Sequence, residues 1–127
     1  MKRTLLLSLC LLACLSGRAM DRMAALSMLE TGNNDRTIGR RGEVSRFQIL
    51  PSVWHRYGLG DPRNPSTAAL AVQRIMAERQ AAFERGHHRS ATNFDFYVLW
   101  NAPAQAGHPG PVVTERAQRF ANLCSRS

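Results

Sequence analysis

The residue best suited to acid chemistry in this chain is Glu30, which stands between two very different segments. It closes an apolar stretch that includes Leu26 and Leu29, and a polar, glycine-containing run leads from it to the apolar string FQIL at 47–50. A carboxyl group packed among apolar side chains loses solvation, which raises its pKa. Because a general acid at neutral pH needs a raised pKa, Glu30 is the leading catalytic candidate. The alternative is a solvated surface acid at a helix end.

The polar run after Glu30 predicts irregular backbone suited to the wall of a binding groove. Residues 36–47 contain Gly39 and Gly42, which favour a loop or a short hairpin. Uncharged, hydroxyl-rich ligands such as glycans are bound through many hydrogen bonds and through stacking on aromatic rings. The candidate stacking residues are Trp54, Tyr57, Tyr97 and Trp100.

Other catalytic and cofactor signatures are missing from the sequence. It contains no phosphate-binding glycine loop, no HExxH and no GxSxG motif. The pair His87-His88 has no partner at metal-ligand spacing, so we expect it to end a helix and we expect no metal or other cofactor. Cys124 has no neighbouring histidine and is expected to be an idle thiol.

The elements that must position Glu30 are mainly helical. Asp21 is expected to cap a first helix that ends at Glu30, just before Gly32. Apolar spacing and flanking proline and glycine residues predict later helices at 48–57, 66–85, 92–101 and 113–123. The fourth helix, which contains FDFYVLW, is expected to be central, and the last helix is expected to set Arg116 and Arg119 outward.

The first residues have the features of an export signal. Lys2 and Arg3 precede an apolar segment that is short for a membrane span, and small residues follow before Met20. We therefore expect 1–19 to be a signal peptide and 20–127 to be the domain of an exported protein, periplasmic or extracellular. The string LLAC, which ends at Cys14, also allows a lipoprotein signal, and lipidation there would attach the protein to a membrane.

The charge of the chain suits an anionic polymer. The full chain carries a net charge of +8, and without 1–19 it keeps 14 basic and 9 acidic residues, a net charge of +5. A basic exported protein is attracted to an anionic cell wall by the same electrostatic interaction that would attract it to nucleic acid. Export argues against nucleic acid as the partner, and the alternative is a solvated basic surface.

The spacing of several residues around Glu30 resembles a known family. Gly42 follows Glu30 after twelve residues, Gln48 and Ile49 begin after eighteen, and Pro51 follows after twenty-one. This pattern is similar to the signature of the lytic transglycosylases, which belong to the lysozyme-like superfamily. The run WNAP at 100–103 resembles a second family element, an aromatic-Asn-Ala-Gly run on a central helix. The resemblance extends over about 21–123, which is nearly all of the chain after the expected signal peptide.

The resemblance implies a function and roles for the matching residues. It implies a lysozyme-like fold and cleavage of the β-1,4 bond between MurNAc and GlcNAc in peptidoglycan, with Glu30 as the single acid and base. Attack by the MurNAc 6-hydroxyl on C1 would leave 1,6-anhydro ends. The family tyrosine that supports the glutamate falls on Trp100. The implied substrate-binding residues are Gln48, Trp100, Asn101, Thr31 and Ser45.

The sequence also departs from the family pattern, which keeps two alternatives open. Ser45 replaces a glycine, Gly39 replaces a serine and Pro103 replaces the last glycine of the second element. One alternative is a hydrolase, whose second carboxylate would be Glu43, Asp35 or Asp61. The other is a catalytically weak or inactive protein that binds glycans in the cell envelope.

Overall fold

The computed structural model describes residues 19–125, and within them the chain forms five α-helices and one short 3-10 helix. The prediction of a mainly helical fold is confirmed. The expected signal peptide, including Cys14, lies outside the described residues apart from Ala19. None of the helices between residues 19 and 125 combines the length and the apolar composition of a membrane span. The elements are α1 Arg22–Thr31, α2 Pro51–Tyr57, α3 Pro65–His87, α4 Asn93–Asn101, η1 Pro103–Gln105 and α5 Pro111–Cys124.

Side-chain caps set the starts of three helices. Asp21 accepts a hydrogen bond from the backbone N–H of Ala24, and Asn64 caps α3 in the same way just before Pro65. Thr92 and Asp95 form a reciprocal capping box at the start of α4. These caps satisfy N–H groups that a helix leaves without intrahelical partners.

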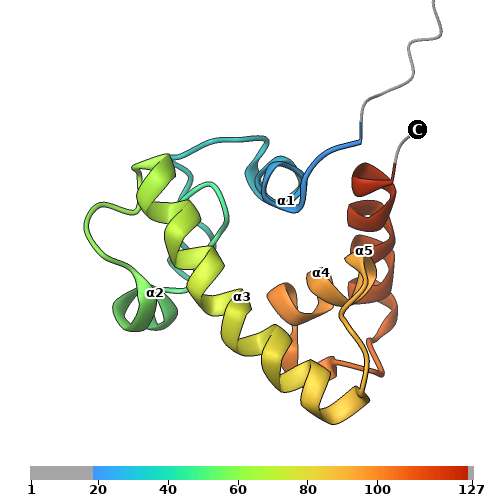
Figure 1. Cartoon of the computed structure of the whole chain (residues 1–127). Helices are drawn as coiled ribbons and strands as arrows, with labels where there is room; N and C mark the ends of the chain where they lie inside the picture. The colour runs from blue at the N-terminus through green and yellow to red at the C-terminus, as the bar shows by residue number, and fades with distance from the viewer. Residues whose placement is uncertain (1–18, 126–127) are drawn as a thin grey trace, which may run out of the picture.

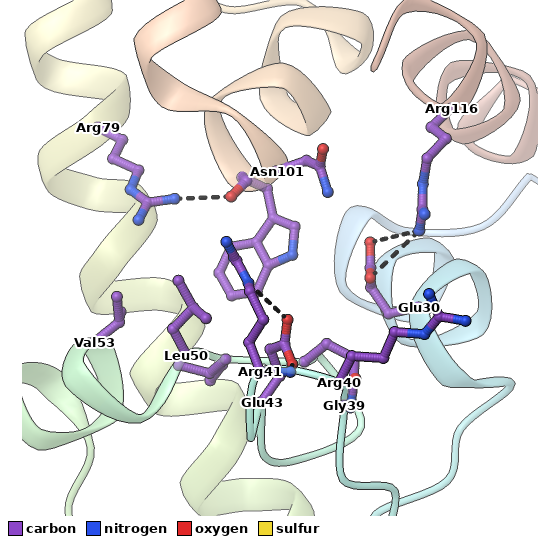
Figure 2. Close-up of a pocket in the computed structure, with 13 residues that line it drawn as sticks. Glu30, Gly39, Arg40, Arg41, Glu43, Leu50, Val53, Arg79, Asn101 and Arg116 are labelled. Carbon is purple, nitrogen blue, oxygen red and sulfur yellow. Dashed lines mark hydrogen bonds and ion pairs between the residues drawn. The ribbon is translucent and has the colours of Figure 1, made fainter. Parts of the chain in front are cut away.

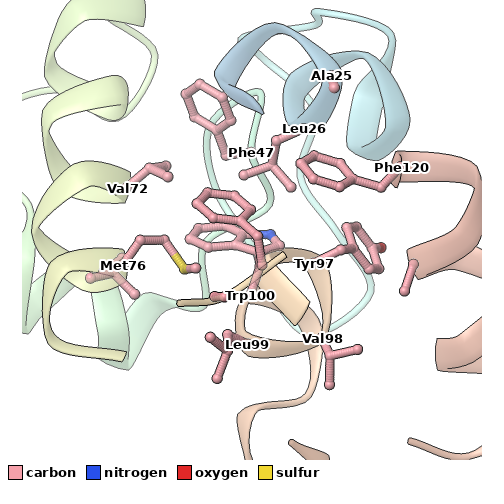
Figure 3. Close-up of a cluster of buried hydrophobic side chains, with 14 of the residues drawn as sticks. Ala25, Leu26, Phe47, Val72, Met76, Tyr97, Val98, Leu99, Trp100 and Phe120 are labelled. Carbon is pink, nitrogen blue, oxygen red and sulfur yellow. The ribbon is translucent and has the colours of Figure 1, made fainter. Parts of the chain in front are cut away.

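Helix α4 is the centre of the fold. It packs most extensively against α5 and also contacts α3, while α1 rests on α5 (Figure 1). Five consecutive residues of α4, from Phe96 to Trp100, are buried. They meet Leu26 of α1, Phe120 of α5 and apolar residues of α3 in one cluster (Figure 3). Because five consecutive residues cover all sides of a helix and all five are buried, the prediction that this helix is central is confirmed.

The segment between α1 and α2 is irregular, as expected. Its only regular pairing is an isolated antiparallel bridge between Val44 and Ile49, with reciprocal N–H···O distances of 2.8 Å. The expected helix at 48–57 begins later, at Pro51. The early start was wrong because Gln48 adopts a left-handed conformation with φ of 57° and Leu50 has a non-helical ψ of 143°.

A core truncation tests this packing. Phe120 is fully buried and its ring packs on Phe96 and Tyr97. We expect Phe120→Ala to lower the free energy of unfolding by about 3–5 kcal/mol, because it removes apolar contact and leaves a cavity. Urea denaturation followed by circular dichroism measures the change. Val112→Ala, at an exposed position of the same helix, is the matched control. Equal stabilities of the two variants would contradict the central role of the α4–α5 contact.

Candidate active site

Glu30 lies in an open pocket with a volume of about 360 Å³. The pocket brings together the end of α1, the loop before α2, and residues of α3, α4 and α5 (Figure 2). Three of the predicted substrate-binding residues, Gln48, Trp100 and Asn101, line it together with Glu30. The other lining residues are Gly39, Arg40, Arg41, Glu43, Ile49, Leu50, Val53, Arg79 and Arg116.

The carboxyl group of Glu30 is mostly buried and is held by two side chains. Its side chain is only 8% exposed. Tyr97 on α4 donates a hydrogen bond from its hydroxyl to Oε1 at 2.7 Å. Arg116 on α5 lies 3.4 Å from Oε1 and 3.5 Å from Oε2, and it donates a further hydrogen bond to the Tyr97 hydroxyl at 2.8 Å. Three helices therefore fix the position of one carboxyl group.

Burial raises the pKa of Glu30 above its ordinary value, because the charged form loses solvation. The Tyr97 hydrogen bond and the positive charge of Arg116 lower this pKa, but they do not outweigh burial. The negative charge of Glu43 raises it further. Glu30 therefore keeps its proton at a higher pH than a solvated glutamate does, and Tyr97 and Arg116 stabilise the carboxylate when it is ionised.

The structure corrects two sequence-based expectations about these contacts. The resemblance assigned the position of the supporting tyrosine to Trp100. In the structure the tyrosine that supports Glu30 is Tyr97, one helical turn before Trp100. Arg116 does not point outward as predicted; its guanidinium turns to Glu30 and Tyr97. Spacing alone could not find Arg116, since it is an arginine on a polar helix face, and only the packing of α5 on α1 and α4 brings it to the site.

Arg79 of α3 fixes the end of α4 that carries the pocket residues. Its guanidinium donates to the carbonyl oxygens of Leu99 and Trp100 at 2.8 and 2.9 Å. These are among the last carbonyls of α4, which have no partner within the helix. Burial lowers the pKa of Arg79. The contact holds Trp100 and Asn101 at the pocket (Figure 2).

Gln48 and Glu43 form a polar wall of the pocket around Gly39. Gln48 donates from Nε2 to the carbonyl oxygens of Thr37 and Ser45 at 3.3 and 3.2 Å. Because residue 39 is a glycine, the Glu43 carboxylate and the Gln48 amide oxygen can both lie close to its backbone; a side chain there would displace these two groups.

Thr31 and Ser45 lie outside the pocket, which corrects their predicted role in substrate binding. Ser45 is 1% exposed and its hydroxyl accepts the backbone N–H of Phe47 at 3.0 Å. Thr31 donates to the carbonyl oxygen of Arg46 at 2.8 Å and accepts the N–H of Asn34 at 3.0 Å. Both hydroxyls therefore hold the loop that supports Gln48.

Several other candidates lie away from the pocket. Of the four aromatic residues considered for stacking, Trp100 is the one that lines it, and Tyr97 is fully buried. Asp35 pairs with Arg46, and Asp61 pairs with Arg63 at the surface. Within 19–125, no group of three or more histidine, cysteine, aspartate or glutamate side chains is placed to hold a metal ion.

Comparison of the chain with protein-family models, with curated proteins and with solved structures finds no match.

Removal of the nearest positive charge tests the balance of effects on Glu30. We expect Arg116→Met to raise the pKa of Glu30, because Arg116 favours the ionised carboxylate. A ¹³C NMR titration of the glutamate side chains measures the shift. Arg119→Met removes an arginine that is paired with Glu115 at the surface of the same helix, and it should leave the pKa of Glu30 unchanged. A fall in the pKa of Glu30 after Arg116→Met would contradict the contact between the Arg116 guanidinium and the Glu30 carboxylate.

Stability should depend on pH through Glu30. Since its folded pKa is raised above the ordinary value of 4.5, Glu30 contributes most to stability below that value. This contribution is lost as the pH rises through the folded pKa. We therefore expect the stability of Glu30→Gln relative to wild type to increase between about pH 4 and pH 8. Urea unfolding over that range measures it, with Glu115→Gln as the control for a lost exposed charge. A constant difference between Glu30→Gln and wild type would show that the carboxyl is solvated.

Proposed function

We propose that this chain is an exported peptidoglycan-cleaving enzyme with a lysozyme-like domain, acting on the β-1,4 bond between MurNAc and GlcNAc. Glu30 is the general acid. The observation that supports this proposal best is the mostly buried Glu30 carboxyl in an open pocket that also contains Gln48, Trp100 and Asn101. Those four residues belong to the two sequence motifs that resemble the lytic transglycosylases.

The surroundings of Glu30 suit the transfer of one proton. A donor must be neutral before the reaction, and burial favours the neutral form. After donation the same group is an anion, and the Tyr97 hydroxyl and the Arg116 guanidinium are already in place to stabilise it. Neither side chain has to move during the reaction, which makes the site preorganised for this step.

The rest of the pocket suits a polymer of sugars that carries negative charge. Asn101 and Gln48 supply amide groups for sugar hydroxyls, and Trp100 supplies an aromatic surface. Arg40 and Arg41 lie at the same pocket, and the chain has an excess of basic residues. Peptidoglycan carries carboxylates on its peptide groups, and a basic pocket attracts them.

Glu30 protonates the glycosidic oxygen as the bond from C1 of MurNAc to that oxygen breaks. Two nucleophiles can then complete the reaction at C1. The MurNAc 6-hydroxyl would form 1,6-anhydro ends, which is the route implied by the resemblance. Water would form reducing ends.

A non-catalytic glycan-binding protein is the second candidate, and one contact favours it. Arg116 lies within ion-pair distance of Glu30, and an ion pair stabilises the carboxylate that cannot donate a proton. In that case the pocket would bind glycan strands without cleaving them.

Substitution of the proposed acid separates the two candidates. We expect wild-type protein to release muropeptides from purified sacculi, and Glu30→Gln to reduce the rate by about 100-fold or more, because the amide cannot donate the proton. Mass spectrometry of the released fragments measures the rate. Glu115→Gln, which removes a carboxylate from the surface of α5, should match wild type.

The outcomes assign the function. Equal release by wild type and Glu30→Gln would remove Glu30 from the mechanism. Retention of wild-type protein on insoluble peptidoglycan without release of fragments would identify the binding protein.

A further inference from the structure

The pocket contains a second carboxylate, Glu43, on a different wall from Glu30. Glu30 enters from the end of α1 beside Arg116, and Glu43 comes from the loop before α2 beside Arg41 (Figure 2). Of the three acids that the sequence offered as a second carboxylate, Glu43 is the one that lines this pocket. Asp35 and Asp61 are occupied in ion pairs with Arg46 and Arg63 away from it.

The loop holds the Glu43 carboxylate in a fixed orientation. Its Oε2 accepts the backbone N–H of Arg41 at 2.8 Å, and its Oε1 lies 3.4 Å from Nε of the same arginine. The Glu43 backbone also pairs with Gly39, whose N–H donates to the Glu43 carbonyl at 2.9 Å. The side chain is 18% exposed, so it remains accessible from the pocket.

The amide oxygen of Gln48 faces the same place. Because Nε2 of Gln48 donates to two backbone carbonyls, the orientation of the amide is fixed and Oε1 is presented as an acceptor. Oε1 of Gln48 and Oε2 of Glu43 both lie over Gly39, within reach of one bridging molecule. A single small molecule that bridges two acceptors must donate two hydrogen atoms, and water can do so.

We propose that Glu43 is the general base of this site and that it activates a water molecule held between its carboxylate and Gln48, so that the enzyme hydrolyses the glycan. This inference rests on the function proposed above. It replaces the 6-hydroxyl of MurNAc with water as the nucleophile.

Glu30 gives its proton to the glycosidic oxygen, and the bond from C1 of MurNAc to that oxygen breaks. The water oxygen forms the new bond to C1, and its proton passes to Glu43. The leaving sugar keeps its 4-hydroxyl and MurNAc gains a reducing end. Attack from the side opposite the leaving group gives the α-anomer first, as in glycosidases that use two separated carboxylates.

The pKa values of the two carboxyl groups are shifted in opposite directions, as expected for one acid and one base. Burial raises the pKa of Glu30. Hydrogen bonds from its own backbone N–H and from Arg41 lower the pKa of Glu43, in spite of some desolvation. Glu43 therefore stays ionised where Glu30 keeps its proton, and such a division identifies the acid and the base in carboxylate pairs.

Substitution of Glu43 tests this role. Glu43→Gln keeps an acceptor for the Arg41 N–H but cannot take a proton, so a merely structural role would survive it. We expect the rate of muropeptide release to fall by about 100-fold. The midpoint of thermal unfolding should stay close to that of wild type. Asp61→Asn, which removes an exposed carboxylate from another part of the chain, should keep the wild-type rate.

Two further measurements do not depend on the folding of Glu43→Gln. Wild-type digestion in H₂¹⁸O should place ¹⁸O at the new reducing ends of MurNAc. Azide added to Glu43→Ala should restore bond cleavage and yield an α-glycosyl azide, because a small anionic nucleophile needs no base.

The outcomes separate this inference from the proposed function. Release of 1,6-anhydro ends alone, or a wild-type rate for folded Glu43→Gln, would overturn the role of Glu43 while leaving Glu30 as the acid. Absence of any bond cleavage by wild type would overturn the proposed function itself.

Discussion

The carboxyl group of Glu30 is buried where α1, α4 and α5 meet, and its removal from water has the largest effect on its pKa. An isolated buried carboxylate is costly, so the fold must supply polar partners at this point. Tyr97 and Arg116 do so from two different helices. Tyr97 in turn packs on Phe120, so the same α4–α5 contact that forms the core also places the partners of the acid. The core and the site are therefore one structure.

The loop before α2 depends on unusual backbone conformations. Ser45 and Gln48 both have positive φ values, 69° and 57°, which residues other than glycine rarely adopt. Such conformations cost of order 1–3 kcal/mol each and persist only where neighbouring contacts hold them. The Val44–Ile49 bridge and the contact between Thr31 and the Arg46 carbonyl provide these contacts. The result is a short, rigid turn that presents the Gln48 side chain to the pocket.

The pocket is basic, but its arginines have different partners. Arg116 is paired with Glu30, and Arg41 is paired with Glu43. Arg79 donates hydrogen bonds to carbonyl oxygens at the end of α4 and so stabilises the end of that helix. Arg40 lines the pocket without an ion pair among the described residues, which makes it the side chain best suited to meet an anionic group of a ligand.

The sequence by itself determined most of the helical segments and pointed to Glu30 as the candidate acid. Apolar periodicity and the capping residues Asp21 and Thr92 are local signals, so the helices were predicted closely. Glu30 was found because it closes an apolar helix and precedes a motif with fixed spacing. Gln48, Trp100 and Asn101 were placed beside it by the same motifs, and the structure brings them to one pocket.

Only the tertiary structure decided which side chains support the acid and which carboxylate accompanies it. Tyr97 and Arg116 are 67 and 86 residues from Glu30, and no local pattern couples positions so far apart. Spacing along the chain does not reveal where a hydroxyl points, so Thr31 at the end of α1 and Ser45, whose φ is positive, were both misplaced. Glu43 was distinguished from Asp35 and Asp61 only by the folding of the loop around Gly39, since all three are acids near Glu30 in the sequence.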